Sequence, residues 1–535
     1  MKLTLEGLKD QAAWQAAGIA LPSYDVAQVA QRTKQAPVWV HFGAGNIFRI
    51  FIGGLDDQLL SSGAADKGIT CVETFDFDVV DKIYQPYDNL VLAVTLNADG
   101  STDKRVLGSL TEAIKAQSNV AQEWDRLKEI FANPGLQMIS FTITEKGYAL
   151  KNAQGDFFPF IQADIDNGPE KPGSAMAVVC ALLFHRYNSG KAPLAVVSMD
   201  NCSHNGEKLR TSILTMAQDW QEKGFVDQAF VDYVSDEAQV SFPWSMIDKI
   251  TPRPAYSVCQ DLAALGVEDM APVITSKNTY IAPFVNTEKP QYLVIEDDFP
   301  AGRPPLEKAG VLFTSRDTVN AVERMKVCTC LNPLHTALAI FGCLLRHTSI
   351  AGEMADQDLR DFVTTMAYEE GMPVVIDPGV IEPKAFLEEV LTQRFPNPFI
   401  PDTPQRIATD TSQKLPIRFG VDMGLHLERG TAGQLQRMPL VLAGWLRYLK
   451  AVDDQGQPFT CSPDPLLEKV QPIAQAIPFG TQATQEDFGS LLEDASIWGV
   501  DLKAAGLSAL VVEDFNRLNQ GPGAVRATLE QLRKG

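Results

Sequence analysis

A tight glycine turn directly behind a short apolar strand restricts the fold of this chain more than any other feature. Residues 39–49 read Trp-Val-His-Phe-Gly-Ala-Gly-Asn-Ile-Phe-Arg. Gly43 and Gly45 allow the backbone to turn sharply after the strand, and we expect a helix to begin at Asn46. Backbone N–H groups and the positive end of that helix would then point at a diphosphate. The turn therefore predicts a dinucleotide-binding fold, with Phe48 in place of the usual third glycine; the alternative is an ordinary tight turn.

A second apolar stretch, residues 68–78, ends in acidic side chains about thirty residues beyond the glycine turn, where a spacing of about 20 is usual. A dinucleotide fold places there the carboxylate that accepts hydrogen bonds from the adenosine ribose. We expect Asp76 rather than Asp78 to fill this role; the alternative is an acidic strand end that faces solvent. No arginine follows closely to bind a 2′-phosphate, so NAD is favoured over NADP. The cofactor-binding candidates are therefore Gly43, Gly45, Asn46, Ile47, Phe48 and Asp76.

Strand-like and helix-like segments alternate through the first half of the chain. Such alternation is typical of parallel strands joined by helical crossovers in a doubly wound sheet. After an irregular, proline-containing passage the pattern becomes mainly helical. We therefore expect an α/β Rossmann-like domain over residues 1–285, a mainly α-helical domain over 286–535, and an active site in the cleft between them. The expected strands are 37–42, 69–75, 89–95, 137–143 and 194–199, and the expected helices of the first half are 46–62, 110–132, 174–188 and 206–223.

Composition narrows the class of protein. A chain of 535 residues exceeds one ordinary core, which agrees with two domains. The net charge of −21 argues against nucleic acid and against an anionic membrane as partners, because both need basic surfaces. The first residues show no apolar segment with a cleavage site, and no apolar run of about 20 residues occurs, so a cytoplasmic location is expected. The eight cysteines and six histidines are scattered, which predicts reduced, mostly buried thiols and no metal site.

Polar side chains interrupt the apolar run of residues 325–339. Asn332 followed by Pro333 is a good N-cap and N1 pair, so we expect a helix to begin there with His335 at N3. Together with Lys326, these side chains suit the oxidation of an alcohol. A base takes the hydroxyl proton, and donors hold the substrate oxygen while hydride leaves the carbon. The alternative is a surface lysine, a structural cap and a core histidine.

Seven motifs follow one another along residues 36–440. They are HFGAGNIFRIF (41–51), TEKGY (144–148), SMDNCSHNGEKL (198–209), FPWSMIDKITPRP (242–254), IEDDFPAGRPPLEKAGVLFT (295–314), ERMKVCTCLNPLHTALA (323–339) and RIATDTSQKLP (406–416). Each alone is weak, but in this combination and order they resemble the mannitol dehydrogenase family, the polyol-specific long-chain dehydrogenases. The resemblance implies a Rossmann-like domain, NAD as cofactor, and a secondary-alcohol dehydrogenase with a lysine base.

The resemblance also assigns roles to individual residues. Lys326 matches the family's general base, and His335 matches the histidine that holds substrate and lysine in position. Asn201 and Asn332 match two asparagines that bind the substrate oxygen and stabilise its charge during hydride transfer. The remaining matches are Thr144 and Glu145 at the cofactor, and Asp248, Arg406 and Lys414 at the substrate.

Three departures from the family pattern are informative. Five residues separate Lys326 from Asn332 where the family usually has four, and Pro333 replaces a glycine. On a continuous helix the extra residue would rotate the lysine by about 100° relative to the asparagine. We therefore expect a break before Pro333. Ile407 follows Arg406 where members that oxidise mannitol carry a histidine, which indicates a substrate other than mannitol.

Among the members of the family, the resemblance is strongest to those that reduce uronates. We expect NAD-linked interconversion of D-fructuronate and D-mannonate, with Arg406 and Lys414 as cations for the end that carries the carboxylate. Reduction of tagaturonate, oxidation of mannitol at C2 and oxidation of mannitol 1-phosphate stay open within the family. From other classes, an NAD-holding sugar-acid epimerase and a catalytically silent sugar-acid sensor stay open. The expected partner is a small sugar acid or polyol, and the expected state is a monomer or a small homo-oligomer.

Overall fold

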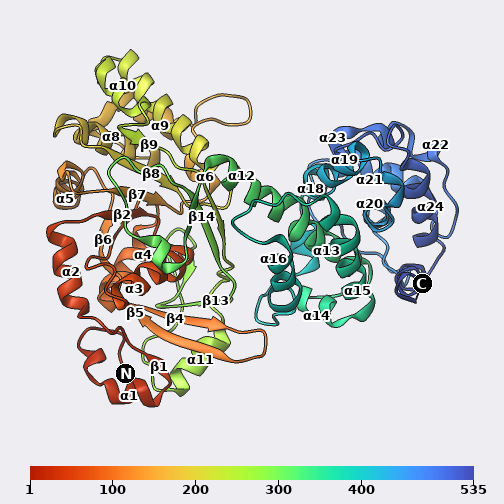
Figure 1. Ribbon diagram of the computed structural model, residues 1–535, viewed down its shortest axis with the longest axis horizontal. Coiled ribbons are helices and arrows are strands. Elements are labelled where there is room, and N and C mark those ends of the chain that lie inside the picture. The colour runs from red at the N-terminus through yellow and green to blue at the C-terminus, as the bar shows by residue number, and fades with distance from the viewer. Residues whose placement is uncertain (535) are drawn as a thin grey trace. The chain divides into compact units, whose positions relative to one another are not determined.

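The computed structural model describes residues 1–534, which divide into two compact units (Figure 1). Each unit has its own core and is described by itself. The mainly helical character predicted for the C-terminal part is confirmed. The sheet unit comprises Met1–Asn97 and Ser101–Asn320, and the helical unit comprises Ala98–Gly100 and Ala321–Gly535.

A six-stranded sheet in which every neighbouring pair is parallel forms the centre of the sheet unit. Across the sheet the strands run β6-β3-β2-β7-β8-β9. The direction of winding reverses between β2 and β7, and open α/β sheets bind ligands in the crevice at the carboxyl ends of the strands at such a switch point. The doubly wound, Rossmann-like fold predicted for this part is confirmed. The strands are β2 (Trp39–Phe42), β3 (Ile69–Glu73), β6 (Leu110–Lys115), β7 (Met138–Phe141), β8 (Leu194–Ser198) and β9 (Val240–Ser241).

One edge of this sheet corrects the sequence prediction. A single helix was expected over 110–132, but Leu110–Lys115 forms β6 and the helix α5 (Ala121–Ala132) begins later. β6 pairs with β3, which is distant in sequence, so tertiary pairing decides its conformation. The predicted strand 89–95 is present as β4 (Val91–Leu96), but it belongs to a different sheet.

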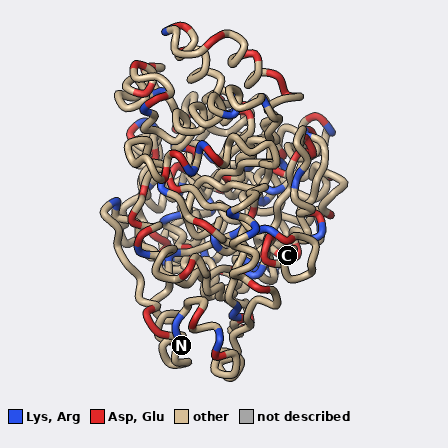
Figure 2. The backbone as a smooth tube through the Cα atoms, turned by 90° about the vertical axis from the view of Figure 1, so that its left-hand side faces the viewer, with Lys and Arg blue, Asp and Glu red and all other residues tan. Residues whose placement is uncertain are grey.

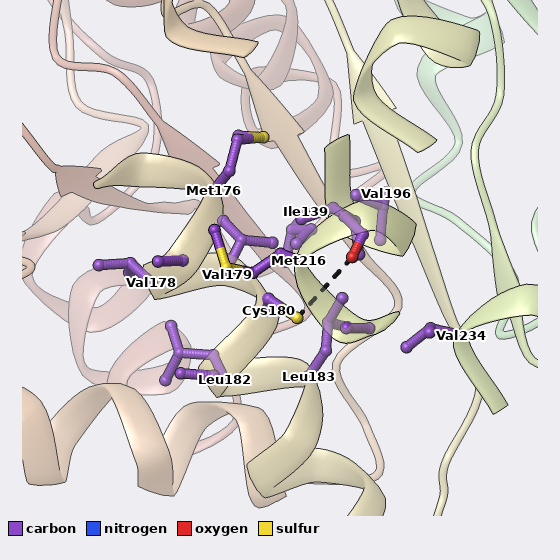
Figure 3. Close-up of a cluster of buried hydrophobic side chains, with 14 of the residues drawn as sticks. Ile139, Met176, Val178, Val179, Cys180, Leu182, Leu183, Val196, Met216 and Val234 are labelled. Atoms are coloured by element: carbon purple, nitrogen blue, oxygen red, sulfur yellow. Dashed lines mark hydrogen bonds between the residues drawn. The ribbon is translucent and has the colours of Figure 1, made fainter. Parts of the chain in front are cut away.

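Helices cover both faces of the parallel sheet, and successive strand residues serve opposite faces. Val40 and Phe42 pack in the cluster that includes α5, α8, α9 and α10, whereas Trp39 packs in the cluster that includes α3. Figure 3 shows the first cluster, in which α8 meets Ile139 of β7 and Val196 of β8. Within it the thiol of Cys180 lies 3.9 Å from a backbone carbonyl. These helices are α3 (Gly53–Ser61), α8 (Ala175–Asn188), α9 (Asn205–Glu222) and α10 (Gln228–Ser235).

Three smaller sheets complete the sheet unit, in the orders β1-β5-β4-β13, β10-β14-β15 and β11-β12. Because β14 pairs with both β10 and β15, the chain stays with the sheet unit beyond residue 285. The division after Asn320 therefore falls later than the boundary expected from sequence. The strands are β1 (Ile19–Ala20), β5 (Thr102–Leu107), β10 (Ser245–Asp248), β11 (Val273–Ile274), β12 (Tyr280–Ile281), β13 (Phe284–Thr287), β14 (Tyr292–Glu296) and β15 (Leu312–Thr314).

The helical unit is organised around two helices, α13 and α20, that are buried almost throughout. Neither has the polar face of a surface helix. α20 packs against α13 and α24, and α15 packs against α25. The helices beyond residue 440 thus complete the core of this unit. The helices named below are α13 (Asn332–Leu344), α14 (Ile350–Ala355), α15 (Gln357–Thr365), α16 (Pro383–Glu389), α17 (Pro404–Ile407), α18 (Thr411–Arg418), α19 (Gly420–Glu428), α20 (Arg437–Tyr448), α24 (Ser508–Leu518) and α25 (Ala524–Lys534).

One helical stretch, Arg316–Leu344, has the length and apolarity of a helix that crosses a membrane. It consists of α12 (Arg316–Arg324), the π-helical turn η7 (Met325–Cys330) and α13. Of its most apolar window, 83% is buried within the protein. A single stretch of this kind is weak evidence for a membrane span, because a buried core helix meets the same criteria.

Charged residues of both signs are spread along the chain, and its cysteines are unpaired. Figure 2 shows Lys and Arg interspersed with Asp and Glu along the chain, without a single basic stripe. All eight cysteines are free, and six of them are buried. The prediction of mostly buried thiols is confirmed.

Candidate functional site

The glycine turn after β2 has the conformation that its sequence requires. Gly43 has a φ of +106°, and a Cβ there would stand 2.3 Å from the carbonyl oxygen of Thr142. At Gly45, by contrast, no atom of the described residues lies within 4 Å of where a Cβ would stand. The chain is helical from Asn46 and continues through the π-helical turn η2 (Phe48–Ile52) into α3. The open side of Gly45 is the kind of space that a diphosphate needs to approach the backbone closely.

The side chain of Phe48 explains how the turn manages without a third glycine. Its ring stacks on His41 with centroids 4.0 Å apart and planes 2° from parallel. Phe48 is fully buried, so its side chain packs against the sheet. Any role of Phe48 at a cofactor therefore falls to its backbone.

Two carboxylates, Glu73 and Asp76, lie at the end of β3, and only Asp76 was expected to bind the cofactor. Glu73 Oε2 accepts a 3.0 Å hydrogen bond from the N–H of Ala44, which fixes the glycine turn to the strand. Asp76 Oδ2 accepts a 2.6 Å hydrogen bond from Thr275, and its Oδ1 is buried without a hydrogen-bond partner in the described chain. This orphaned oxygen is compatible with a ligand hydroxyl. Glu73 was missed, although its position as the last residue of the strand was a signal.

The turn after β7 is held by a buried aspartate. Thr144 has a φ of +66°, and its N–H donates a 2.9 Å hydrogen bond to Asp200. Tyr148 donates a 2.5 Å hydrogen bond to the same carboxylate, and burial raises the pKa of Asp200. Thr144 thus lies beside the β2–β7 switch point, as its predicted cofactor role requires. Glu145 is exposed and pairs with Lys208 at 2.5 Å.

Asn205 connects the two remaining predicted positions of the sheet unit. Its amide donates 2.9 Å hydrogen bonds to the carbonyls of Asp200 and Ser245, and its oxygen accepts one of 3.0 Å from the N–H of Ser245. Asn201 follows Asp200 and is exposed, and Asp248 ends β10 and is buried. The saturated Asn205 amide therefore ties the loop that carries Asn201 to the start of β10, the strand that ends at Asp248.

In the helical unit, Lys326 lies on η7 and is 4% exposed. The N–H of Leu331 donates to the carbonyl of Lys326 at 3.1 Å, which closes a five-residue π-helical turn. A π-turn holds one residue more than an α-turn, so the extra residue between Lys326 and Asn332 is absorbed there. Leu331 then leaves the helical region, with φ −130° and ψ −61°. The expected break is therefore present.

The start of α13 corrects one prediction. The N-cap is Leu331, Asn332 is the first helical residue, and no side chain caps the helix. Pro333 is therefore second and His335 fourth, one position later than expected. The shift arises because the helical conformation breaks at Leu331. Pro333 alone would place the break at Asn332, the residue directly before it.

Cations gather around His335. Burial lowers the pKa of His335 to about 3, with further lowering from Arg418, Arg406, Lys414 and Arg394. Asp402 lies 3.7 Å from His335 and also pairs with Arg406. The structure thus brings His335, Arg406 and Lys414 together.

Arg418 was not predicted from the sequence, although it lies four residues after Lys414. On α18 that spacing puts both side chains on one face. Arg394 and Asp402 were also missed. Asp402 lies four residues before Arg406, with which it pairs, whereas Arg394 had no local signal. Among residues 1–534, no three His, Cys, Asp or Glu side chains are grouped as metal ligands.

The family is established by comparison with known proteins. The model of the mannitol dehydrogenase Rossmann domain matches residues 38–308, and that of the mannitol dehydrogenase C-terminal domain matches residues 318–519. This chain belongs to the mannitol dehydrogenase family, and it is an oxidoreductase of that family. The family, fold class and enzyme class expected from the sequence are confirmed.

Individual relatives cover the chain from end to end. A D-mannonate oxidoreductase of Thermotoga maritima is 49% identical over 99% of both chains. The structure of Pseudomonas fluorescens mannitol 2-dehydrogenase, a ternary complex with NAD and D-mannitol, is 28% identical with a TM-score of 0.70 over 100% of both chains. A substrate-free D-sorbitol dehydrogenase is 25% identical, with a TM-score of 0.80 over 95% of this chain and 97% of the other.

Proposed function

We propose that this protein is an NAD-dependent dehydrogenase that interconverts D-fructuronate and D-mannonate. One observation carries the proposal: Lys326, Asn332 and His335 lie on one buried stretch of a chain that is 49% identical, over its whole length, to a D-mannonate oxidoreductase. The glycine turn, with open space at Gly45 and an orphaned oxygen on Asp76, fits NAD. The NAD complex of the related mannitol 2-dehydrogenase supports the same cofactor.

The residues divide the work of alcohol oxidation. The Lys326 amine takes the proton of the hydroxyl that becomes the ketone of D-fructuronate. Asn332 and Asn201 donate hydrogen bonds to the substrate oxygen while its charge develops. His335 keeps the substrate oxygen near the lysine; with its pKa lowered to about 3, it is a neutral imidazole at physiological pH. The residues of the glycine turn would hold NAD, which would supply the hydride acceptor, and reduction of the ketone would follow the same steps in reverse.

The charge of the helical unit supports an acidic substrate. Four cations contribute to the lowered pKa of His335: Arg394, Arg406, Lys414 and Arg418. One carboxylate, Asp402, lies 3.7 Å from it. A protein with a net charge of −21 repels an anionic substrate at long range. Local cations offset this repulsion where a uronate would bind.

The test is NADH oxidation with D-fructuronate, D-tagaturonate, D-fructose and fructose 6-phosphate in parallel. A clear preference in kcat/KM for D-fructuronate is expected. Activity only with another ketose would retain the mechanism and reject the substrate. The absence of NADH oxidation with all four substrates, despite tight NADH binding, would favour the epimerase. We also propose that the enzyme acts in the cytoplasm on a small sugar acid, without nucleic acid or membrane as partner, as a monomer or small homo-oligomer.

A further inference from the structure

Arg418 is a partly buried guanidinium without a counter-ion in the described chain. Its Nη1 donates a 2.7 Å hydrogen bond to the hydroxyl of Thr336 and lies 3.5 Å from the carbonyl of Asn332. No carboxylate of residues 1–534 lies within ion-pair distance of it, and its Nε and Nη2 make no hydrogen bond there. Burial lowers its pKa to about 10. An arginine desolvated to this degree normally has an anion beside it.

The contacts of Arg418 place it on the face of α13 that carries the predicted substrate residues. Asn332 and Thr336 are four residues apart on this helix, and His335 lies between them on the same side. Arg418 is also the largest charge contribution to the lowered pKa of His335. The guanidinium of Arg418 therefore lies beside the first turn of α13, which carries Asn332 and His335.

Lys414 also has no carboxylate of the described residues within ion-pair distance. Its Nζ donates to the backbone carbonyls of Ile407, at 2.8 Å, and Thr409, and to no carboxylate. Burial and Arg418 lower its pKa to about 8. Arg406 differs, because Asp402 already neutralises it. Of the two cations expected from sequence, only Lys414 has no carboxylate of residues 1–534 within ion-pair distance, although Asp410 and Asp464 lie close enough to oppose the lowering of its pKa.

We infer that Arg418 and Lys414 form the subsite that binds the carboxylate of a sugar-acid substrate, and that Arg418 is the residue that selects acids over neutral ketoses. The inference rests on the proposed function and names the side chain that gives the enzyme its specificity for acids. The planar guanidinium has two free N–H directions, which suit a bidentate contact with a carboxylate. Lys414 adds a point charge, and Arg406 stays paired with Asp402.

The experiment compares Arg418→Met with Arg418→Lys and with Arg429→Met, an exposed arginine at the end of α19. The readout is the ratio of kcat/KM for D-fructuronate to that for D-fructose, which lacks the carboxylate. Arg418→Met should lower this ratio by about 100-fold, Arg418→Lys by less, and Arg429→Met should leave it unchanged. Equal losses with both substrates would show that Arg418 only supports the fold of α13, and would overturn the inference.

A second measurement separates this inference from the proposed function. If the wild-type enzyme reduces only neutral ketoses, the proposed substrate is wrong, and competition by D-gluconate then tests the subsite. Inhibition by D-gluconate of the wild-type enzyme but not of Arg418→Met would support the carboxylate subsite without the uronate reaction. Equal inhibition of both, or inhibition of neither, would overturn it.

Discussion

The hydroxyl of Thr329 lies 3.1 Å from Oδ1 of Asp422 and joins the π-turn that carries Lys326 to helix α19. Asp422 is 1% exposed, and its other oxygen has no hydrogen-bond partner in the described chain. Burial raises the pKa of Asp422 to about 8, so near neutral pH it is mostly a protonated acid. A neutral hydrogen bond therefore connects α19 to the turn on which the proposed base lies.

Asp422→Ala should lower kcat by about 10-fold with little change in the Kd for NADH. The variant loses the acceptor for Thr329, so the π-turn can relax and move the Lys326 amine. Asp422→Asn keeps an acceptor and should retain most of the activity. The measurements are steady-state kinetics and NADH titration. A fall in NADH affinity equal to that in kcat would contradict a role confined to the lysine turn.

Lys326→Ala should lower kcat by roughly 10²- to 10⁴-fold, because it removes the proposed general base. NADH binding, measured by fluorescence titration, should persist. Lys384→Ala changes an exposed lysine of α16 and is the matched control. Near-normal turnover of Lys326→Ala would move the base to another group.

The two glycines of the cofactor turn should respond differently to alanine. Gly43→Ala should destabilise the protein by about 2 kcal/mol or more, because its φ of +106° and the nearby Thr142 carbonyl exclude a Cβ. Gly45→Ala should keep wild-type stability, because its Cβ enters open space, and should weaken NADH binding by at least about 10-fold. Thermal unfolding and NADH titration check the pair. Unchanged affinity in Gly45→Ala would show that the diphosphate does not approach there.

Glu353 of α14 should make stability depend on pH. It is fully buried, neither of its carboxyl oxygens has a hydrogen-bond partner in the described chain, and burial raises its pKa from 4.5 to about 9. The folded state thus holds a proton that the unfolded chain has lost, so the free energy of unfolding falls as pH rises between these two values. Glu353→Gln should remove this slope.

Relative to wild type, Glu353→Gln should gain roughly 4 kcal/mol in unfolding free energy between about pH 5 and about pH 8. Chemical denaturation at both pH values measures the gain. Glu388→Gln changes an exposed glutamate of α16 and should show no such gain. A constant difference between Glu353→Gln and wild type at both pH values would show that Glu353 is ionised in the folded state.

The parts of the fold that follow from local sequence could be predicted. The glycine turn, the strands around it and the doubly wound sheet all follow from glycine conformation and from strand–helix alternation over short distances. β6 could not be predicted, because its strand state depends on pairing with β3 about forty residues away. The later domain division has the same origin, since β14 stays in the sheet unit through its pairing with β10.

In the candidate site, too, residues that act through contacts distant in sequence could not be predicted. Lys326, Asn332 and His335 are found from their spacing within one segment, and the break between them follows from Pro333. Asp422 acts through its contact with Thr329, which is far away in sequence, so no local pattern indicates it. Arg418 could be predicted only in part. Its spacing from Lys414 can be found in the sequence, but the absence of a counter-ion beside it can be found only in the structure.

The π-turn at Lys326 makes the number of residues in this segment adjustable. One added residue is stored within a single turn, and the helix that follows keeps its place in the core of the helical unit. In a regular helix, an inserted residue would rotate every later side chain about the helix axis. Here its effect is confined to the π-turn. A search that demands a fixed gap between the lysine and the asparagine would therefore pass over this chain, although both side chains are present.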